Sequence, residues 1–286
     1  MAFAHEIETV FVNSQYSKED NWGVSKAGNF TKFVTSKITP SIKSERKTEL
    51  FNNTLLPSVM KNGKEYTEIS LEGIASCEEL PIILGDFKSD APSAPISYTI
   101  EHAGIKIPGC VVSGWEISGD TSEIRVNANL IGKKAVKSAP STGTTPAKIS
   151  VFDGINTTIK IGGSLVNKVF NWSVSMDDIW SPVYFIGSVE PANVAHVPSS
   201  GNFTINVPAD DYALGMLGSL DTVPVEITNT QTVNGTTFGF KITFDVRLDE
   251  PDTFSDEEGV YAIGLKGKIM NKTGKAVEVV ITKTGE

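Results

Sequence analysis

Few side chains in this sequence have the types and spacing that catalysis or metal binding requires. The three histidines, His5, His102 and His196, lie far apart, and none stands in an H-E-x-x-H or comparable ligand pattern. Residues 162–166, Gly-Gly-Ser-Leu-Val, miss the G-x-S-x-G nucleophile elbow and favour a hairpin turn instead. No P-loop or glycine-rich dinucleotide motif is present. The sequence therefore predicts neither an enzyme nor a bound cofactor or metal.

Carboxylates are abundant, but their spacing carries little chemical signal. The pair Asp210 and Asp211 is explained by the first turn of a helix. The segment 249–258 contains six acidic residues and is interpreted as a solvated acidic loop. A calcium site built from these oxygens is the alternative, although no ligand spacing favours it.

The cysteines and tryptophans are predicted to be structural. Cys77 and Cys110 lie among apolar neighbours and form no C-x-x-C motif, so we expect two buried free thiols. The four tryptophans suggest a sugar-binding platform as one alternative. Trp115 and Trp172 fall in alternating segments, which favours a place in the core.

Composition and charge exclude several classes of protein. The 286 residues are 40% hydrophobic, which is ordinary for a globular chain. Lys and Arg number 25 against 34 Asp and Glu, for a net charge of −9, so a protein that grips nucleic-acid phosphates is not expected. The start has neither the basic nor the apolar region of a signal peptide, and no apolar run is long enough for a membrane helix. We expect a protein that is made and folds in a cytoplasm.

Alternation of apolar and polar residues dominates the chain and predicts a mainly β fold. It is clearest in 124–130, 240–248 and 261–269, and it indicates strands with one buried and one solvated face. Helical patterns are confined to 76–85 and 208–218, each with acidic residues first and glycine last. Further strands are expected at 30–38, 66–73, 95–102, 108–118, 149–161, 167–176, 202–208, 223–229 and 276–282.

The order and spacing of these elements predict an internal duplication. Counting from Val34 in one half and Val169 in the other, the next alternating strand begins 35 and 34 residues later. A Leu-Gly pair then ends each predicted helix after a further 15 and 14 residues. We expect an N-terminal arm at 1–29, one β domain at 30–137, a linker at 138–148 and a second β domain at 149–286. Chance agreement between generic β patterns is the alternative.

Both halves contain a long loop in the same position, at 40–64 and at 179–201. Loops of this length in compact domains are usually functional or disordered, and these two are rich in apolar residues. One interpretation is that they contact another subunit, and the other is that each folds back over its own core. The residues proposed for contacts between subunits are Leu50, Phe51, Leu55, Leu56, Val59, Trp180, Tyr184, Phe185 and Val189.

These features together resemble the tail tube proteins of tailed bacteriophages and related viruses. The resemblance lies in the loop residues 55–59, the strand 66–73 and the helix 78–85. It continues in 159–163 and 169–175, which look like the opening of a second copy. The resemblance spans about residues 30–280 and implies two tandem tube-like β-sandwich or β-barrel domains, each with one short helix and one long loop that reaches a neighbouring ring.

Members of that family with two fused tube folds form trimeric rings with pseudo-sixfold symmetry. The resemblance therefore implies a virion protein that stacks as rings into a hollow tail tube for viral DNA, together with tape measure, terminator and baseplate proteins. A negative pore wall would let DNA pass without binding it. The lumen-facing candidates are Glu68, Ser70, Glu72, Asn202, Thr204 and Asn206, although these could equally face outside solvent.

Other classes of protein remain as alternatives. A distal-tail or baseplate ring protein of the same virion shares the fold but assembles as a single ring. A tandem β-sandwich adhesin would require a secretion signal, and a hydrolase on a β scaffold would require a nucleophile or carboxylate constellation.

Overall fold

The computed structural model describes residues 14–49, 59–84, 95–197, 199–209, 221–248, 254–257, 259–270 and 277–284. Within these residues strands dominate, which confirms the predicted mainly β fold. The helical elements are α1 (Leu80–Leu84) and the 3-10 turn η1 (Gly154–Asn156). The strands are β1 (Gln15–Lys18), β2 (Phe30–Lys32), β3 (Ser36–Glu49), β4 (Val59–Ile74), β5 (Tyr98–His102), β6 (Ile105–Asp120), β7 (Ile124–Gly132), β8 (Val136–Lys137), β9 (Gly143–Thr144), β10 (Thr157–Ile161), β11 (Ser164–Leu165), β12 (Asn171–Asp177), β13 (Trp180–Val183), β14 (Asn193–His196), β15 (Ser200–Pro208), β16 (Thr222–Val233), β17 (Thr236–Leu248), β18 (Phe254–Glu257), β19 (Val260–Met270) and β20 (Val277–Thr284).

One continuous antiparallel sheet runs through both halves of the chain, and we call it the long sheet. Its strand order is β3-β4-β7-β6-β12-β15-β19-β18. Successive side chains point to opposite faces of a sheet, so alternation gives each strand two chemically different sides. Every second residue of β7 is buried, from Ile124 to Gly132, and β12 and β15 repeat this alternation. The long sheet therefore has one apolar face and one polar face.

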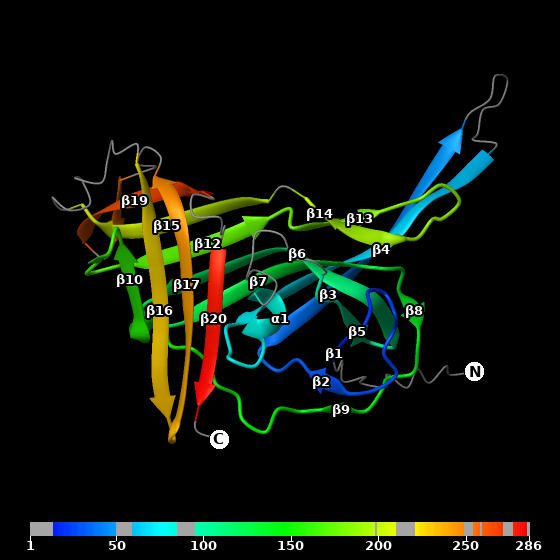
Figure 1. Ribbon diagram of the computed structural model, residues 1–286, viewed down its shortest axis with the longest axis horizontal. Helices are drawn as coiled ribbons and strands as arrows, with labels where there is room; N and C mark the ends of the chain where they lie inside the picture. The colour runs from blue at the N-terminus through cyan, green and yellow to red at the C-terminus, as the bar shows by residue number, and fades with distance from the viewer. Residues whose placement is uncertain are drawn as a thin grey trace, which may run out of the picture.

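Two smaller groups of strands pack with the long sheet around one continuous core. The first group contains β1, β2, β5, β8, β9 and the start of β6, and the second contains β10, β11, β16, β20 and the start of β17. In Figure 1, β16, β17 and β20 cross the direction of β6, β7 and β12. The strands β6 and β17 each begin in a smaller group and end in the long sheet.

Seven strand pairings of the first half recur in the second half. A single pairing, β6 with β12, joins the two halves through the long sheet in the part of the chain that the structure describes. The recurring pairs are β1–β2 and β10–β11, β1–β5 and β10–β16, β3–β4 and β12–β15, β4–β7 and β15–β19, β5–β6 and β16–β17, β6–β7 and β17–β19, and β6–β8 and β17–β20.

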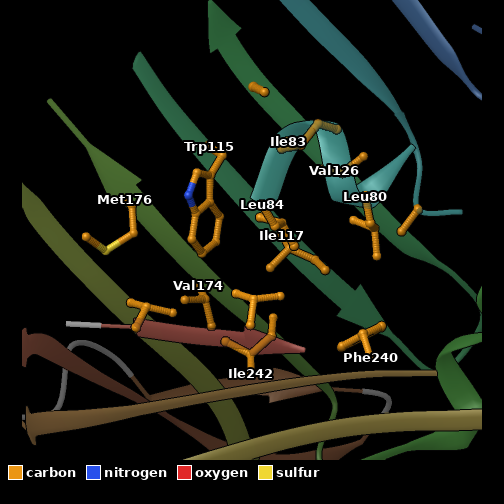
Figure 2. Close-up of a cluster of buried hydrophobic side chains, with 14 of the residues drawn as sticks. Leu80, Ile83, Leu84, Trp115, Ile117, Val126, Val174, Met176, Phe240 and Ile242 are labelled. Atoms are coloured by element: carbon orange, nitrogen blue, oxygen red, sulfur yellow. The ribbon is translucent and has the colours of Figure 1, made fainter. Parts of the chain in front are cut away.

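The core contains residues from both halves. Figure 2 shows Leu80, Ile83 and Leu84 of α1 over Ile117 of the long sheet, with Phe240 of β17 in the same cluster. Trp115 and Trp172 are each 3% exposed, which confirms their predicted place in the core. Burial of this kind contributes about 1.5–3 kcal/mol for each large apolar side chain. The two halves are thus packed together as well as joined by a sheet.

The described part of the predicted N-terminal arm, from residue 14 on, contains a strand. Residues 15–18 form β1, which pairs with β2 and β5. The adjoining Glu19 is 6% exposed, and its carboxylate accepts hydrogen bonds from the hydroxyls of Ser97 and Thr99 and from the N–H groups of Gly23 and Gly109. A strand of four residues is too short to give a clear alternation, so the sequence did not reveal it.

Residues 40–64 are mostly strand, so their prediction as a loop is wrong for the described part. They belong to β3 up to Glu49 and to β4 from Val59, and Figure 1 shows this hairpin projecting from the rest of the fold. The pairing is irregular between Ser44 and Arg46. Several side chains on both faces of this stretch of β3 are exposed, so no apolar alternation marks the strand.

The segment 138–148, expected to be a linker, is fastened to the first half. Gly143 and Thr144 pair in parallel with β2, and Ser141 donates its N–H and its hydroxyl to the Glu101 carboxylate. Burial raises the pKa of Glu101, but the Nζ of Lys106 at 2.8 Å and the donors from Ser141 and Gln15 outweigh burial, so its pKa lies below the usual value.

The predicted helix at 76–85 is real but shorter, because α1 begins at Leu80. Ser76 does cap the turn, since its Oγ accepts the N–H of Glu79 at 3.3 Å. The carboxylate of Glu78 accepts the Ser150 N–H and pairs with Lys283, so it connects this turn to two places in the second half, Ser150 and β20. The predicted helix at 208–218 lies outside the described residues beyond 209.

The acidic segment 249–258 is not a loop throughout. Residues 254–257 form β18, which pairs with β19 from Phe254 opposite Ile263 to Glu257 opposite Val260. The sequence analysis missed this strand because acidic residues, which are uncommon in strands, dominate the segment. Residues 249–253 and 258 lie outside the described part.

Candidate assembly interface

The long sheet ends in two strands that each have one neighbour among the described residues. At one end β3 pairs with β4, and at the other end β18 pairs with β19. The outer edge of such a strand presents unpaired N–H and C=O groups, which are a template for pairing with another chain. These two edges are the first components of a candidate interface.

A buried carboxylate fixes the start of β3. Glu79 is 3% exposed, and its Oε1 accepts the N–H groups of Val34 at 2.6 Å and Thr35 at 2.9 Å. Its second oxygen accepts the hydroxyl of Ser36. Bonds to a charged acceptor are stronger than neutral ones, so this residue holds the chain where it enters the edge strand.

Apolar side chains are exposed at both ends of the long sheet. Ile42 on β3 is 58% exposed, Phe254 on β18 is 50% exposed and Tyr261 on β19 is 63% exposed. The rings of Phe254 and Tyr261 stack with their centroids 5.1 Å apart and their planes 8° apart. Such groups at open strand edges are typical of a surface that is covered on assembly.

The second long loop forms a small hairpin, β13 with β14, that packs back at its base. Trp180 and Val194 are 5% and 6% exposed. The connection reaches the first half, because the Glu65 N–H donates to the Val189 carbonyl at 2.8 Å, and Figure 1 shows the hairpin beside β4. The base of this hairpin therefore packs on its own chain, as in the second of the two interpretations of the long loops.

The tip of the same hairpin is exposed. Phe185 is 64% exposed and Ile186 is fully exposed. Next to them, the Nζ of Lys64 lies 5.0 Å from the ring centre of Tyr184. Burial, with smaller effects of the nearby Tyr66 and Glu45, raises the pKa of Tyr184 to about 12. Phe185 and Ile186 are thus two adjacent exposed apolar side chains next to the partly buried Tyr184. Such a pair is typical of a surface that contacts another molecule.

The other predicted contact residues are less informative. Leu50, Phe51, Leu55 and Leu56 lie outside the described residues. Val59 is the first residue of β4, and its side chain also lies outside the described part, while Val189 is 39% exposed.

The six lumen-facing candidates lie on one face of the long sheet. Cα partners point to the same side of a sheet, and the ladder connects both sets through β7, β6 and β12. The polar side is tied together by contacts between neighbouring strands. Lys43 Nζ lies 3.0 Å from the Glu68 carboxylate, and the hydroxyls of Ser173 and Thr204 lie 2.6 Å apart. The candidates are Glu68, Ser70, Glu72, Asn202, Thr204 and Asn206.

The described residues contain no group of three or more His, Cys, Asp or Glu side chains arranged for a metal ion. Both cysteines are free and buried, as predicted, and burial raises the pKa of each thiol. His102 is half-buried, burial lowers its pKa, and its Nδ1 lies 2.8 Å from the Ser14 hydroxyl.

Sequence reasoning missed the edge strand β18 and its aromatic pair. Phe254 is the one apolar residue in 254–257, so the segment shows no alternation, and the surrounding carboxylates favoured a loop. The pairing of β6 with β12 was also missed, because pairing between distant strands depends on contacts that local patterns do not record.

Comparison with known families identifies the fold. A family model described as phage tail tube protein matches residues 13–279 of this chain. Comparison with curated proteins gives no match. Among the described residues, no helix is long and apolar enough to cross a membrane.

Proposed function

This chain is a member of the phage tail tube protein family, and we propose that it polymerises as stacked rings into the hollow tube through which viral DNA reaches the host. The observation that supports this proposal best is the long sheet, which has one polar face and an open strand edge at each end. A sheet of this kind becomes a closed wall when copies join edge to edge, and closure removes the open edges.

The ring is proposed to contain three chains. Each chain contributes the two halves of the long sheet, so three chains supply six similar units around the axis. The recurrence of seven strand pairings supports this pseudo-sixfold arrangement, with the proposed domains at 30–137 and 149–286 and with β1, from residues before 30, added to the first. The pairing of β6 with β12 is then the contact between units within a chain.

The polar face of the long sheet is proposed to line the lumen. Glu68, Ser70 and Glu72 supply this face in one half, and Asn202, Thr204 and Asn206 supply it in the other. The chain carries a net charge of −9, so a ring of three carries about −27. The same face also carries Lys43, which pairs with Glu68, and Lys266 and Lys268, which lie opposite Thr204 and Asn202. These cations are interspersed with carboxylate and amide groups, so no stripe of positive charge forms to hold DNA phosphates.

The two projecting hairpins are proposed to join successive rings. The β3–β4 hairpin extends away from the body of the fold, and the tip of β13–β14 presents Phe185 and Ile186 beside it. Hydrophobic contacts at such positions contribute to stacking without altering the wall. We place the finished protein in the virion tail, after assembly in the host cytoplasm, with tape measure, terminator and baseplate proteins as partners.

Negative-stain electron microscopy of the purified protein tests this function. Long hollow tubes are the expected result. Single rings that do not stack would support a distal-tail or baseplate ring protein instead, and a protein that stays monomeric at high concentration would contradict the proposal. Denaturing electrophoresis of purified virions, with the band identified by mass spectrometry, should find this chain as an abundant tail component.

A further inference from the structure

The pairing of β6 with β12 shows how two similar halves of this fold join edge to edge within one chain, and we call this ladder the template. This ladder joins the edge of the first half to the first long-sheet strand of the second half. The Cα partners are Trp115–Met176, Glu116–Ser175, Ile117–Val174, Ser118–Ser173, Gly119–Trp172 and Asp120–Asn171.

The second half has its own equivalent of the end of β6, which is β18. In the first half β6 turns into β7 through residues 120–123, where the Asp120 N–H donates to the Glu123 carbonyl at 3.2 Å. In the second half β18 turns into β19 through residues 257–260, with Glu257 opposite Val260. Both hairpins have two central residues, and each residue of the second lies 137 positions after its counterpart.

A second observation gives the same alignment independently. Where β4 ends, the Ala75 N–H donates to the Ile124 carbonyl at 2.8 Å. Where β15 ends, the Ala209 N–H donates to the Tyr261 carbonyl at 2.9 Å. Tyr261 again lies 137 positions after Ile124.

The same alignment extends to the other edge of the long sheet. Ala209 lies 134 positions after Ala75, so β15 is matched with β4 residue by residue. Ile69 of β4 faces Pro40, and its counterpart Phe203 faces Val174. Strand β3 is therefore the counterpart of β12, with Pro40 in the place of Val174.

We propose that β18 of one copy pairs with β3 of the next copy in the register that β6 and β12 use within the chain. This inference rests on the proposed ring and names the residues that meet. The partners are Lys37–Glu257, Ile38–Asp256, Thr39–Ser255 and Pro40–Phe254.

The side chains are complementary at three of the four pairs, and the exception is Ile38 with Asp256. Lys37 meets Glu257, so opposite charges face each other directly, an arrangement that stabilises antiparallel pairs. Thr39 meets Ser255, where Ser173 meets Ser118 in the template. Pro40 meets Phe254, an apolar pair in the place of Val174 and Ile117. Proline is tolerated in edge strands, which suits the position of Pro40.

Side-chain volume also changes in a compensating way. In the template, the Trp172 indole covers Gly119 so closely that a Cβ there would lie 2.8 Å from its Nε1. In the proposed contact the smaller Ile38 replaces the indole, and Asp256 replaces the glycine. The large residue and the glycine have thus both been exchanged for residues of intermediate size.

The contact explains the apolar side chains that are exposed at both ends of the long sheet. Phe254 and Tyr261 are 50% and 63% exposed, whereas their counterparts Ile117 and Ile124 are each 0% exposed. Ile42 and its counterpart Met176, at 58% and 2%, differ in the same way. A second copy of the chain on these edges supplies the cover that the two halves already supply to each other.

Cysteine cross-linking in assembled tubes tests the register. The variant Thr39→Cys/Ser255→Cys places two thiols directly opposite, where Cβ atoms lie about 4.5–5.5 Å apart, close to disulfide range. The matched control, Ser41→Cys/Ser255→Cys, keeps both thiols on the same face but moves one by two residues, to about 7–8 Å, and leaves the Lys37–Glu257 pair intact. The native thiols of Cys77 and Cys110 are buried and do not compete.

Mild oxidation followed by non-reducing electrophoresis should give linked chains for the first variant, ending at a trimer, and at least about fivefold fewer for the control. Equal or greater linkage in the control, or none in either variant while tubes form, would overturn the register. Failure of the unmodified protein to form tubes or rings would instead overturn the proposed function. Bands beyond the trimer would keep the register but contradict a ring of three.

A charge exchange supplies a second measurement without new thiols. Lys37→Glu alone places two carboxylates opposite each other, and we expect about a fivefold to tenfold rise in the critical concentration for assembly. Lys37→Glu combined with Glu257→Lys should restore assembly to near the original value. A double variant no better than the single variant would contradict the pairing of these two residues.

Discussion

Replacing Glu79 with alanine should destabilise the start of β3 more than replacing any other carboxylate discussed above. The side chain is 3% exposed and accepts two backbone N–H groups, at 2.6 and 2.9 Å, plus one hydroxyl. A buried donor that loses its acceptor costs about 1–3 kcal/mol. The two N–H groups, from Val34 and Thr35, are only partly buried, since Val34 is 42% exposed, so water replaces part of the lost acceptor and we expect a loss of roughly 1–3 kcal/mol in the free energy of unfolding. Glu79→Gln keeps one oxygen for both donors and should cost only about 1 kcal/mol.

Urea unfolding of the unassembled protein measures this difference, and hydrogen exchange at the Val34 and Thr35 amides locates it. Both amides should exchange slowly in the original protein and in Glu79→Gln, and fast in Glu79→Ala. The exposed Glu72→Ala serves as the control and should change the free energy of unfolding by less than about 0.5 kcal/mol. Equal losses for Ala and Gln at position 79, or unchanged protection of the two amides in the Ala variant, would refute the role assigned to this carboxylate.

Three further outcomes are expected. Glu68→Lys with Glu72→Lys should allow tubes to form but slow DNA release from virions at low salt, with recovery at high salt because screening weakens phosphate binding; an unchanged rate argues against a lumen position. Phe185→Asp with Ile186→Asp should shorten tubes while leaving rings intact in electron micrographs, and tubes of normal length would count against ring stacking. The folded pKa of Glu101 is below its unfolded value of about 4.3, so the stability that this carboxylate contributes is present above that pH and is lost as pH falls through the folded pKa. Glu101→Gln should therefore reduce the change in the urea midpoint between about pH 5 and pH 3. An unaltered dependence of the midpoint on pH would contradict this.

Local patterns predicted the parts of the fold in which one face of a strand is buried. The strand at 124–130 was visible because Val126 and Leu130 pack in the core while Asn127 and Asn129 are exposed. The Gly162–Gly163 turn was likewise predictable, since both residues have positive φ, 60° and 82°, in the hairpin of β10 and β11. Glycine adopts this conformation without strain, so its position marks the turn.

Other parts had no local signal. Residues 41–45 of β3 include exposed side chains on both faces of the strand, so their sequence resembles a loop. Glu79 was one of the acidic residues at the start of the helix predicted at 76–85, although its carboxylate accepts donors from residues 34–36, more than 40 positions away. The edge strand β18 was hidden by its charges. For Glu79 the decisive contact joins residues that are distant in the chain, whereas β3–β4 and β18–β19 are pairings of neighbouring strands whose polar composition gave no alternation.

Cryo-electron microscopy of the assembled tube tests the central claim most directly, because it shows which strands join and which face lines the lumen. The account predicts three chains in each ring, with β18 of one chain beside β3 of the next and with Glu68 and Glu72 facing the central channel. A map that places both carboxylates on the outer surface, or that joins neighbouring chains through strands other than β3 and β18, would contradict it.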